Sequence, residues 1–142
     1  MNPPFRGSYL CGEVRYELDE FTDFTSFCHC KMCRKFHGAA FSTMAAVPAD
    51  KFRWTQGEDA LQKYTAPNET VRTFCRHCGS SLSYWSPRAR QDIMEIAIGS
   101  LDDDCPIRPN AHIFTDFGAN WLEWGAELPC YREGRDGPLV SD

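Results

Sequence analysis

The chain has 142 residues, of which 42% are hydrophobic and 25% charged, so it fits one globular domain and neither a disordered nor a fibrous protein. Its 15 Lys and Arg residues against 20 Asp and Glu residues give a net charge of −5, which disfavours nucleic acid as a partner. No apolar run is long enough for a membrane helix, and the N-terminus lacks the pattern of a secretory signal. We therefore expect a soluble, cytoplasmic protein with no membrane partner.

Short strands separated by turn residues are predicted along most of the chain. The clearest runs from Glu13 to Asp19, where polar and apolar residues alternate with a period of two. Only the segment after Cys33 and the turn at 48–51 favour a helical turn or two. The pattern predicts a mainly β fold of antiparallel sheets with few short helices. Further strands are expected at 39–47, 52–55, 61–64, 71–74, 82–85, 94–98, 112–114 and 121–124.

The end of the chain differs in composition from the rest. Residues 133–142 are rich in Gly, Pro and charged side chains, which is typical of a loosely held terminus. We expect a single domain over residues 1–132, followed by this C-terminal tail.

Eight cysteines are the unusual feature, because thiols in a reducing compartment point to metal binding or thiol chemistry before disulfides. Cys28, Cys30 and Cys33 form a C-x-C-x-x-C motif that can supply three corners of a tetrahedron. A catalytic zinc site keeps its fourth corner open for substrate. Three thiolates around Zn²⁺ leave a net charge of −1, which suits a soft substrate such as a thiolate better than the ionisation of water.

A second motif, Cys75-x-x-Cys78, is followed by Gly79, and Cys11 stands alone before Gly12. The C-x-x-C-G turn suits zinc, because glycine permits the positive φ that directs backbone N–H groups toward sulfur. The same pair also fits a redox dithiol, and it could join the triplet in one closed site. The spacing alone leaves these alternatives open.

The order of these motifs resembles the glutathione-dependent formaldehyde-activating enzyme family from about Gly7 to Trp124. The resemblance implies a β-tent-like fold of antiparallel sheets with two zinc positions. It rests on the run Gly7–Tyr16, on Cys28-His29-Cys30 with Cys33-Arg34-Lys35 and Gly38, on Phe74-Cys75 with Cys78-Gly79-Ser80, and on later echoes at Ile98–Asp102, Pro109 and His112–Phe114.

The resemblance assigns the cysteines to two sites. Cys28, Cys30 and Cys33 match the ligands of the catalytic zinc, and Cys11, Cys75 and Cys78 match three of the four ligands of the structural zinc. The fourth structural ligand falls on Tyr9, where the family has cysteine. A phenol titrates near pH 10 and is a poor zinc ligand at neutral pH, so one or two zinc ions are expected.

Three outcomes are open for the structural site. Water or a nearby side chain could complete it, it could be only partly filled, or Cys105 or His112 could replace the missing cysteine. Otherwise Cys105 and Cys130 are interpreted as spare thiols, and His112 as a hydrogen-bonded core histidine.

The implied activity is that of an S-(hydroxymethyl)glutathione synthase-like carbon–sulfur lyase acting on glutathione and formaldehyde, with no catalytic residues beyond the metal ligands. The alternatives are a non-catalytic, zinc-stabilised binding module of the same fold and a thiol–disulfide redox protein that uses Cys75 and Cys78. The sequence gives no indication of oligomeric state.

Several other charged, histidine and aromatic side chains lie near the motifs. Arg34 and Lys35 are either solvated charges or a site for substrate carboxylates. His29 and His77 are expected to point outward, and His37 to lie at the surface. Trp121, Leu122 and Trp124 are expected to form the wall or core of a sheet.

Overall fold

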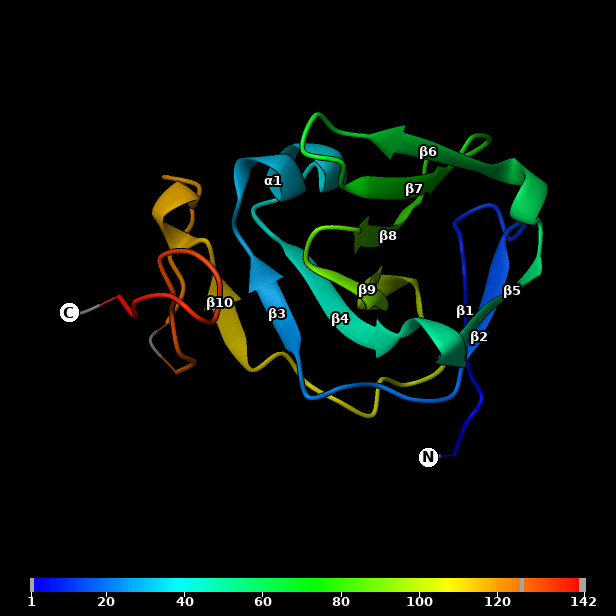
Figure 1. Ribbon diagram of the computed structural model, residues 1–142, viewed down its shortest axis with the longest axis horizontal. Helices are drawn as coiled ribbons and strands as arrows, with labels where there is room; N and C mark the ends of the chain where they lie inside the picture. Colours follow the sequence, from blue (N-terminus) through cyan, green and yellow to red (C-terminus); the bar gives the residue numbers. More distant parts are fainter. Residues whose placement is uncertain (1, 126, 141–142) are drawn as a thin grey trace. The chain divides into compact units, whose positions relative to one another are not determined.

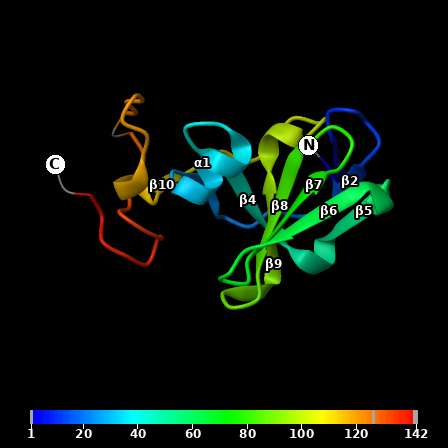
Figure 2. The same ribbon diagram turned by 90° about the horizontal axis from the view of Figure 1, so that it is seen from above.

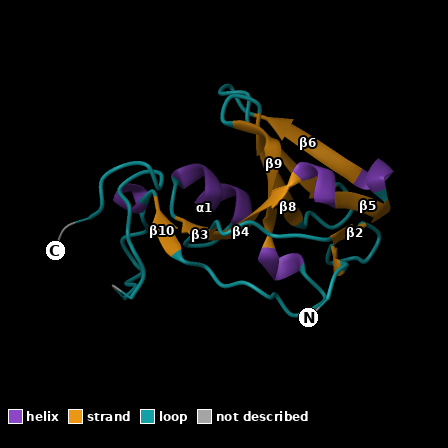
Figure 3. Ribbon diagram, turned by 60° about the horizontal axis from the view of Figure 1, so that its bottom comes forward, coloured by secondary structure: helices purple, strands orange, loops and turns teal. Residues whose placement is uncertain are grey.

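Strands dominate the computed structural model, which describes residues 2–125 and 127–140 (Figures 1 and 3). The prediction of a mainly β fold with few short helices is confirmed. Within the described residues the one α-helix is α1 (Lys31–His37). The strands are β1 (Phe5–Ser8), β2 (Arg15–Leu18), β3 (Thr25–Cys28), β4 (Ser42–Pro48), β5 (Phe52–Gln56), β6 (Leu61–Thr65), β7 (Val71–Cys75), β8 (Ser81–Ser86), β9 (Arg90–Ala97) and β10 (Ala111–Ile113).

The chain forms two compact units. The first comprises the described residues up to Asp23 together with Ala45–Ile107, and the second comprises Phe24–Met44 together with the described residues from Arg108 onward. Strand β4 runs from the second unit into the first. Short 3₁₀ turns occur in both units, at Ala49–Lys51 (η1), Glu58–Ala60 (η2), Ile98–Ser100 (η3) and Thr115–Phe117 (η4).

The first unit contains two antiparallel arrangements. Strands β1, β2 and β5 form a three-stranded sheet in that order, and β6, β7, β8 and β9 follow one another as a meander (Figure 2). The alternation expected around β2 is realised, since Tyr16 and Leu18 are buried while Arg15 is exposed. Gly7 lies opposite Tyr16, and a Cβ atom there would approach the Tyr16 ring to 2.2 Å. The close pairing of β1 and β2 therefore requires glycine at this position.

The core of the first unit is built from inward-facing strand residues and aromatic rings. The Tyr16 ring stacks on Phe52 with centroids 5.2 Å apart, and its hydroxyl lies 2.7 Å from Ser100 Oγ. Cys75 is fully buried in the same core. Burial of so much aromatic and aliphatic surface is the main stabilising contribution here. The buried members are Phe5, Tyr9, Val14, Tyr16, Leu18, Ala45, Val47, Ala60, Cys75, Leu82 and Ile96.

The second unit is organised around a parallel pair of strands and helix α1. β10 runs parallel to β3, with His112 opposite Phe27 and Ile113 opposite Cys28. This pair departs from the expected antiparallel pattern, because its strands come from chain segments far apart in the sequence. Helix α1 follows β3 directly and ends at Gly38, which adopts the left-handed conformation and donates its N–H to the Arg34 carbonyl.

Three local expectations were wrong. Strands β1 and β3 were not predicted, because four-residue segments that include Gly, Ser or Thr carry little periodic signal. The segment 121–124 is not a strand. Its aromatic rings act singly: Trp121 is 67% exposed, whereas the ring of Trp124 packs on that of His29, 4.2 Å between centroids.

The division into a domain over 1–132 and a tail over 133–142 stays a prediction. Within the tail, Arg135 donates hydrogen bonds to the carbonyl of Thr25 at 3.1 Å and to Ser26 Oγ at 2.8 Å. In the part of the chain that is described, no helix is long and apolar enough to span a membrane.

Candidate metal centres

The triplet cluster (Cys28, Cys30 and Cys33) lies where β3 gives way to α1 in the second unit. Cys28 is the last residue of the strand, Cys30 is the N-cap of the helix, and Cys33 is in its first turn. The extended backbone of Cys30, with φ −62° and ψ 153°, turns the chain between the two elements. A cap side chain and a residue three positions later lie on the same side of a helix start, so the fold itself brings these sulfurs together.

The three sulfurs of the triplet cluster converge. Their Sγ atoms all lie within 4.8 Å of one another, and Cys30 Sγ also accepts a hydrogen bond from the Cys33 N–H at 3.3 Å. Cys28 and Cys33 are each 8% exposed. Three sulfurs at this separation suit a single thiophilic ion such as Zn²⁺. Cys75 and Cys78 group with Cys11 instead, so the hypothesis of one merged site is wrong.

Protonation of the triplet cluster is governed by crowding and burial. Hydrogen bonds with Cys30 and Cys33, followed by burial, raise the pKa of Cys28 far above its usual range. A hydrogen bond with Cys28 lowers the pKa of Cys33, but Cys30 and burial outweigh it and raise that pKa to about 11. In the metal-free cluster Cys28 and Cys33 therefore hold their protons at neutral pH, and a bound cation must displace them.

Two buried histidines lie behind the triplet cluster. His29 is fully buried and His112 is 6% exposed, with His29 Nε2 2.8 Å from His112 Nδ1. The rings of Phe27, Phe41 and Trp124 surround the pair. Burial, followed by His112 and Arg34, lowers the pKa of His29 to about 4, and burial also lowers that of His112. Both rings are neutral at pH 7.

One of the two expectations for these histidines is confirmed and the other is wrong. The expectation that His112 is a hydrogen-bonded core residue is confirmed, whereas the expectation that His29 points outward is wrong. His29 directly follows β3, and its backbone N–H donates to the Ile113 carbonyl of β10 at 3.0 Å. A strand predicted at 25–28 would have indicated that His29 is buried, but that strand is too short to recognise from the sequence.

The turn cluster (Cys11, Cys75 and Cys78) is assembled in the first unit from two tight turns. Cys75 ends β7, and Gly79 at φ 78° donates its N–H to the Cys75 carbonyl at 2.8 Å. Cys11 lies in the loop between β1 and β2, where Gly12 at φ 76° donates its N–H to the Tyr9 carbonyl at 2.8 Å. The positive φ expected of the glycine after Cys78 is confirmed.

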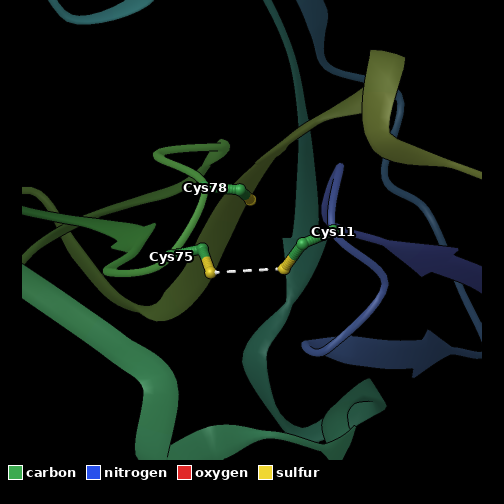
Figure 4. A group of neighbouring side chains, drawn as sticks. All are labelled: Cys11, Cys75 and Cys78. Carbon is green, nitrogen blue, oxygen red and sulfur yellow. Dashed lines mark hydrogen bonds between the residues drawn. The ribbon is translucent and has the colours of Figure 1, made fainter.

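The sulfurs of the turn cluster also meet, although 64 residues separate Cys11 from Cys75. All three Sγ atoms lie within 4.8 Å of one another, with those of Cys11 and Cys75 3.8 Å apart, facing each other (Figure 4). Cys75 is buried, Cys78 partly buried and Cys11 exposed. Although burial raises the pKa of Cys78, hydrogen bonds from the Ser80 side chain and from the backbone of Ser80 and Cys11 lower it to about 6.

No fourth ligand joins the turn cluster from the described part of the chain. No other histidine, cysteine or carboxylate ligand atom there lies within 4.8 Å of all three sulfurs. Of the three outcomes left open for this site, replacement of the missing cysteine by Cys105 or His112 is not seen among the described residues. Cys130 is likewise outside both clusters.

Tyr9, at the position where the resemblance requires cysteine, is a core residue. It is 2% exposed, its hydroxyl lies 3.5 Å from Thr73 Oγ1, and its ring meets Trp54 edge to face at 6.4 Å. Burial, and to a lesser extent Cys75 and Cys78 close by, raises the pKa of Tyr9 well above its usual range. Its side chain stays a neutral phenol, which is unsuited to binding a metal ion.

A basic cavity lies along helix α1, on the same helix that carries Cys33. It has a volume of about 470 Å³. The guanidinium of Arg34 donates a hydrogen bond to the Phe117 carbonyl at 2.9 Å, which holds that group in place, while Lys31 and Lys35 are exposed. Such cations favour an anionic ligand. The cavity is lined by Lys31, Arg34, Lys35, Gly38, Ala39 and Trp121.

The remaining histidines lie at or near the surface. His77, between the two cysteines of the C-x-x-C turn, is half exposed and lies 3.5 Å from the Glu13 carboxylate, so its outward orientation is confirmed. His37, at the end of α1, is partly buried, and its ring contacts that of Phe36 edge to face. Neither joins a cysteine cluster.

Comparisons with known proteins agree with this architecture. Among solved structures, a crystal structure of a Rhodobacter sphaeroides protein matches with a TM-score of 0.60 and 24% identity, over 71% of this chain and 91% of that one. That likeness shows a shared fold. No curated protein matches the chain. The family described as glutathione-dependent formaldehyde-activating enzyme matches residues 4–117, a span that includes both cysteine clusters. The chain therefore belongs to the glutathione-dependent formaldehyde-activating enzyme family.

Proposed function

We propose that the protein is a zinc-dependent carbon–sulfur lyase of the S-(hydroxymethyl)glutathione synthase type, with the triplet cluster as its reaction centre. The observation that carries this proposal is the convergence of three buried or partly buried sulfurs at the start of α1. Membership of a family whose description names glutathione and formaldehyde supports the choice of substrates. Because the reaction needs thiols that stay reduced, we place the protein in the cytoplasm.

The reaction is a reversible addition of a thiol to an aldehyde. The sulfur of glutathione bonds to the carbonyl carbon of formaldehyde, the C=O π electrons move to oxygen, and the proton released by the thiol ends on that oxygen. A zinc ion held by Cys28, Cys30 and Cys33 would supply positive charge that favours the thiolate form of the substrate. No atom is lost, so the protein need only bind and orient the two reactants.

The basic cavity gives the chain a means to orient glutathione. Lys31, Arg34 and Lys35 present three cations on the face of α1, and glutathione carries two carboxylates. Trp121 adds an exposed aromatic surface to the same cavity. In this proposal the carboxylates bind to the basic side chains while the thiol reaches the triplet cluster.

The direct test is the rate of S-(hydroxymethyl)glutathione formation, measured by NMR exchange because the uncatalysed addition is fast. We expect the wild-type protein to accelerate exchange, and Cys30→Ser to lower the protein-dependent rate by about 100-fold, since loss of a ligand exceeds the usual effect of a supporting residue. Cys130→Ser is the matched control, because Cys130 lies outside both clusters. Equal rates for wild type and Cys30→Ser would leave the non-catalytic binding module as the better description.

A further inference from the structure

The turn cluster offers a metal ion three sulfurs from two loops, and no fourth histidine, cysteine or carboxylate ligand atom from the described residues. Zinc completes a tetrahedral set of four donors, so three sulfurs alone leave one position to be filled. The donor set fits a thiophilic divalent ion, because three Sγ atoms lie within 4.8 Å of one another. The identity of the fourth donor therefore decides how this site behaves.

Tyr9 is held away from that role by its packing. Its ring lies in the core of the first unit, against Trp54, and its hydroxyl is directed to Thr73. Releasing it would expose a large aromatic surface and leave a cavity in the core, both of which are unfavourable. The side chain two positions before Cys11 is thus committed to the core.

One side of the turn cluster faces solvent. Cys75 is completely buried, but Cys11 is exposed and the neighbouring Leu10 is 85% exposed. Protein closes the side of the cluster at Cys75, and the side at Cys11 is accessible from solution. A small molecule can therefore reach a metal ion at this cluster without any movement of the core.

We propose that the turn cluster binds a divalent metal ion through Cys11, Cys75 and Cys78 and takes its fourth donor from solution as the sulfur of a small thiol. The turn cluster is then a ligand-binding site as well as a structural one. This inference does not depend on the catalytic role proposed for the triplet cluster.

A thiol suits this position better than water does. Soft sulfur donors already surround the ion, and thiolate complements them. Two cations flank the turns: Arg15, at the start of β2, donates to the Gly12 carbonyl at 3.1 Å, and the exposed Arg76 follows Cys75. Glu13 is the carboxylate on these loops, and it lies 3.5 Å from His77.

The test compares two substitutions at one position. Tyr9→Cys and Tyr9→Ser remove the same ring and differ only in sulfur against oxygen. Each protein is loaded with Co²⁺, whose charge-transfer absorption reports the number of bound sulfurs, and titrated with 2-mercaptoethanol. We expect Tyr9→Cys to take up about one thiol fewer per chain than wild type or Tyr9→Ser, because its own sulfur fills the fourth position. We also expect the Co²⁺ of Tyr9→Cys to transfer to a chelator at least about 10-fold more slowly than the Co²⁺ of wild type or Tyr9→Ser.

A second variant avoids the core altogether. Cys11→Ser changes an exposed residue, and we expect it to lower metal content and thiol uptake by about one equivalent each while circular dichroism stays unchanged. Equal thiol uptake by Tyr9→Cys and Tyr9→Ser, or unchanged uptake in Cys11→Ser, would overturn the proposal. The proposed function can fail without affecting this result. If the triplet cluster binds no thiol, the number of thiols bound per chain falls equally in wild type and in every variant, so the differences between them remain.

Discussion

The triplet cluster and the turn cluster contain the same number of sulfurs but are built in opposite ways. The triplet cluster comes from six consecutive residues at a strand-to-helix junction, and two of its three cysteines are buried. The turn cluster joins two loops that are 64 residues apart, and one of its cysteines is exposed. In the first, local backbone geometry sets the sulfur positions, whereas in the second they depend on the packing of the whole unit.

The same contrast extends to the protons. Crowding and burial raise the pKa values of Cys28 and Cys33, while hydrogen bonds lower the pKa of Cys78 to about 6. Similar sets of sulfur donors can therefore differ in protonation because of their surroundings: Cys28 and Cys33 hold their protons, whereas Cys78 loses its proton more readily and Cys11 is exposed to solvent.

The largest expected effect concerns alkylation of the metal-free protein. At pH 7 the thiol of Cys78, with its pKa near 6, is mostly thiolate, whereas that of Cys33, with its pKa near 11, is almost wholly protonated. We expect iodoacetamide to modify Cys78 on the order of 100-fold faster than Cys33, after allowing for the lower nucleophilicity of the less basic sulfur. Time-resolved peptide mass spectrometry measures both rates, and comparable rates would contradict the contrast.

The next effect concerns the histidine inside each cysteine motif. His29 is buried and bonded to His112, whereas His77 is half exposed. We expect His29→Gln to lower the free energy of unfolding by about 2 to 3 kcal/mol, because it disrupts a buried hydrogen bond and the packing around it. His77→Gln, the matched control, should change it by less than about 0.5 kcal/mol. Denaturant unfolding measures the free energy of unfolding of both variants. A similar loss of stability in the two would show that burial does not distinguish the two histidines.

A third test uses pH. The pKa of His29 is about 4 in the folded protein and near 6.5 when unfolded, so the unfolded chain binds the proton first as pH falls. Stability is complete above about pH 6.5 and declines toward pH 4, with a slope of up to about 1.4 kcal/mol per pH unit from this group. We expect the slope between pH 6.5 and 5 to diminish in His29→Gln. If acid acts only through metal loss, wild type and variant will show the same slope.

The smallest effect concerns the basic cavity beside the triplet cluster. Replacing Arg34 and Lys35 together by glutamine should raise the KM for glutathione by about 3- to 5-fold with little change in kcat, as befits exposed charges. The KM for 2-mercaptoethanol, which has no carboxylate, should stay the same. A parallel rise for both thiols would mean that these side chains support the fold of α1 and do not select the substrate.

Sequence reasoning recovered the features that are local. Alternation around β2, the 3₁₀ turn at 49–51, the positive φ of Gly79 and the grouping of Cys28, Cys30 and Cys33 all follow from a few neighbouring residues. The likeness to a family placed Cys11 with Cys75 and Cys78, which spacing could not do, because the turn cluster depends on how β1, β2 and β7 pack.

The features that escaped prediction depend on distant contacts. The burial of His29 requires β10 to lie beside β3, and a three-residue strand more than 80 residues away carries too weak a pattern to reveal that pairing. The run at 121–124 has the aromatic content of a strand, yet the structure uses Trp124 to cover two histidine rings and leaves Trp121 at the surface. Composition indicated that aromatic rings at 121–124 pack against other residues, but the tertiary structure is needed to show which ring packs and which stays exposed.

The different origins of the two clusters also set an order during synthesis. The ribosome has incorporated all three cysteines of the triplet cluster once it has added Cys33. A nascent chain can therefore begin to bind an ion there before most of its fold has formed. The turn cluster cannot form until Cys78 has been added and the two loops that carry its cysteines have packed together. The triplet cluster can therefore be complete in the nascent chain before the turn cluster.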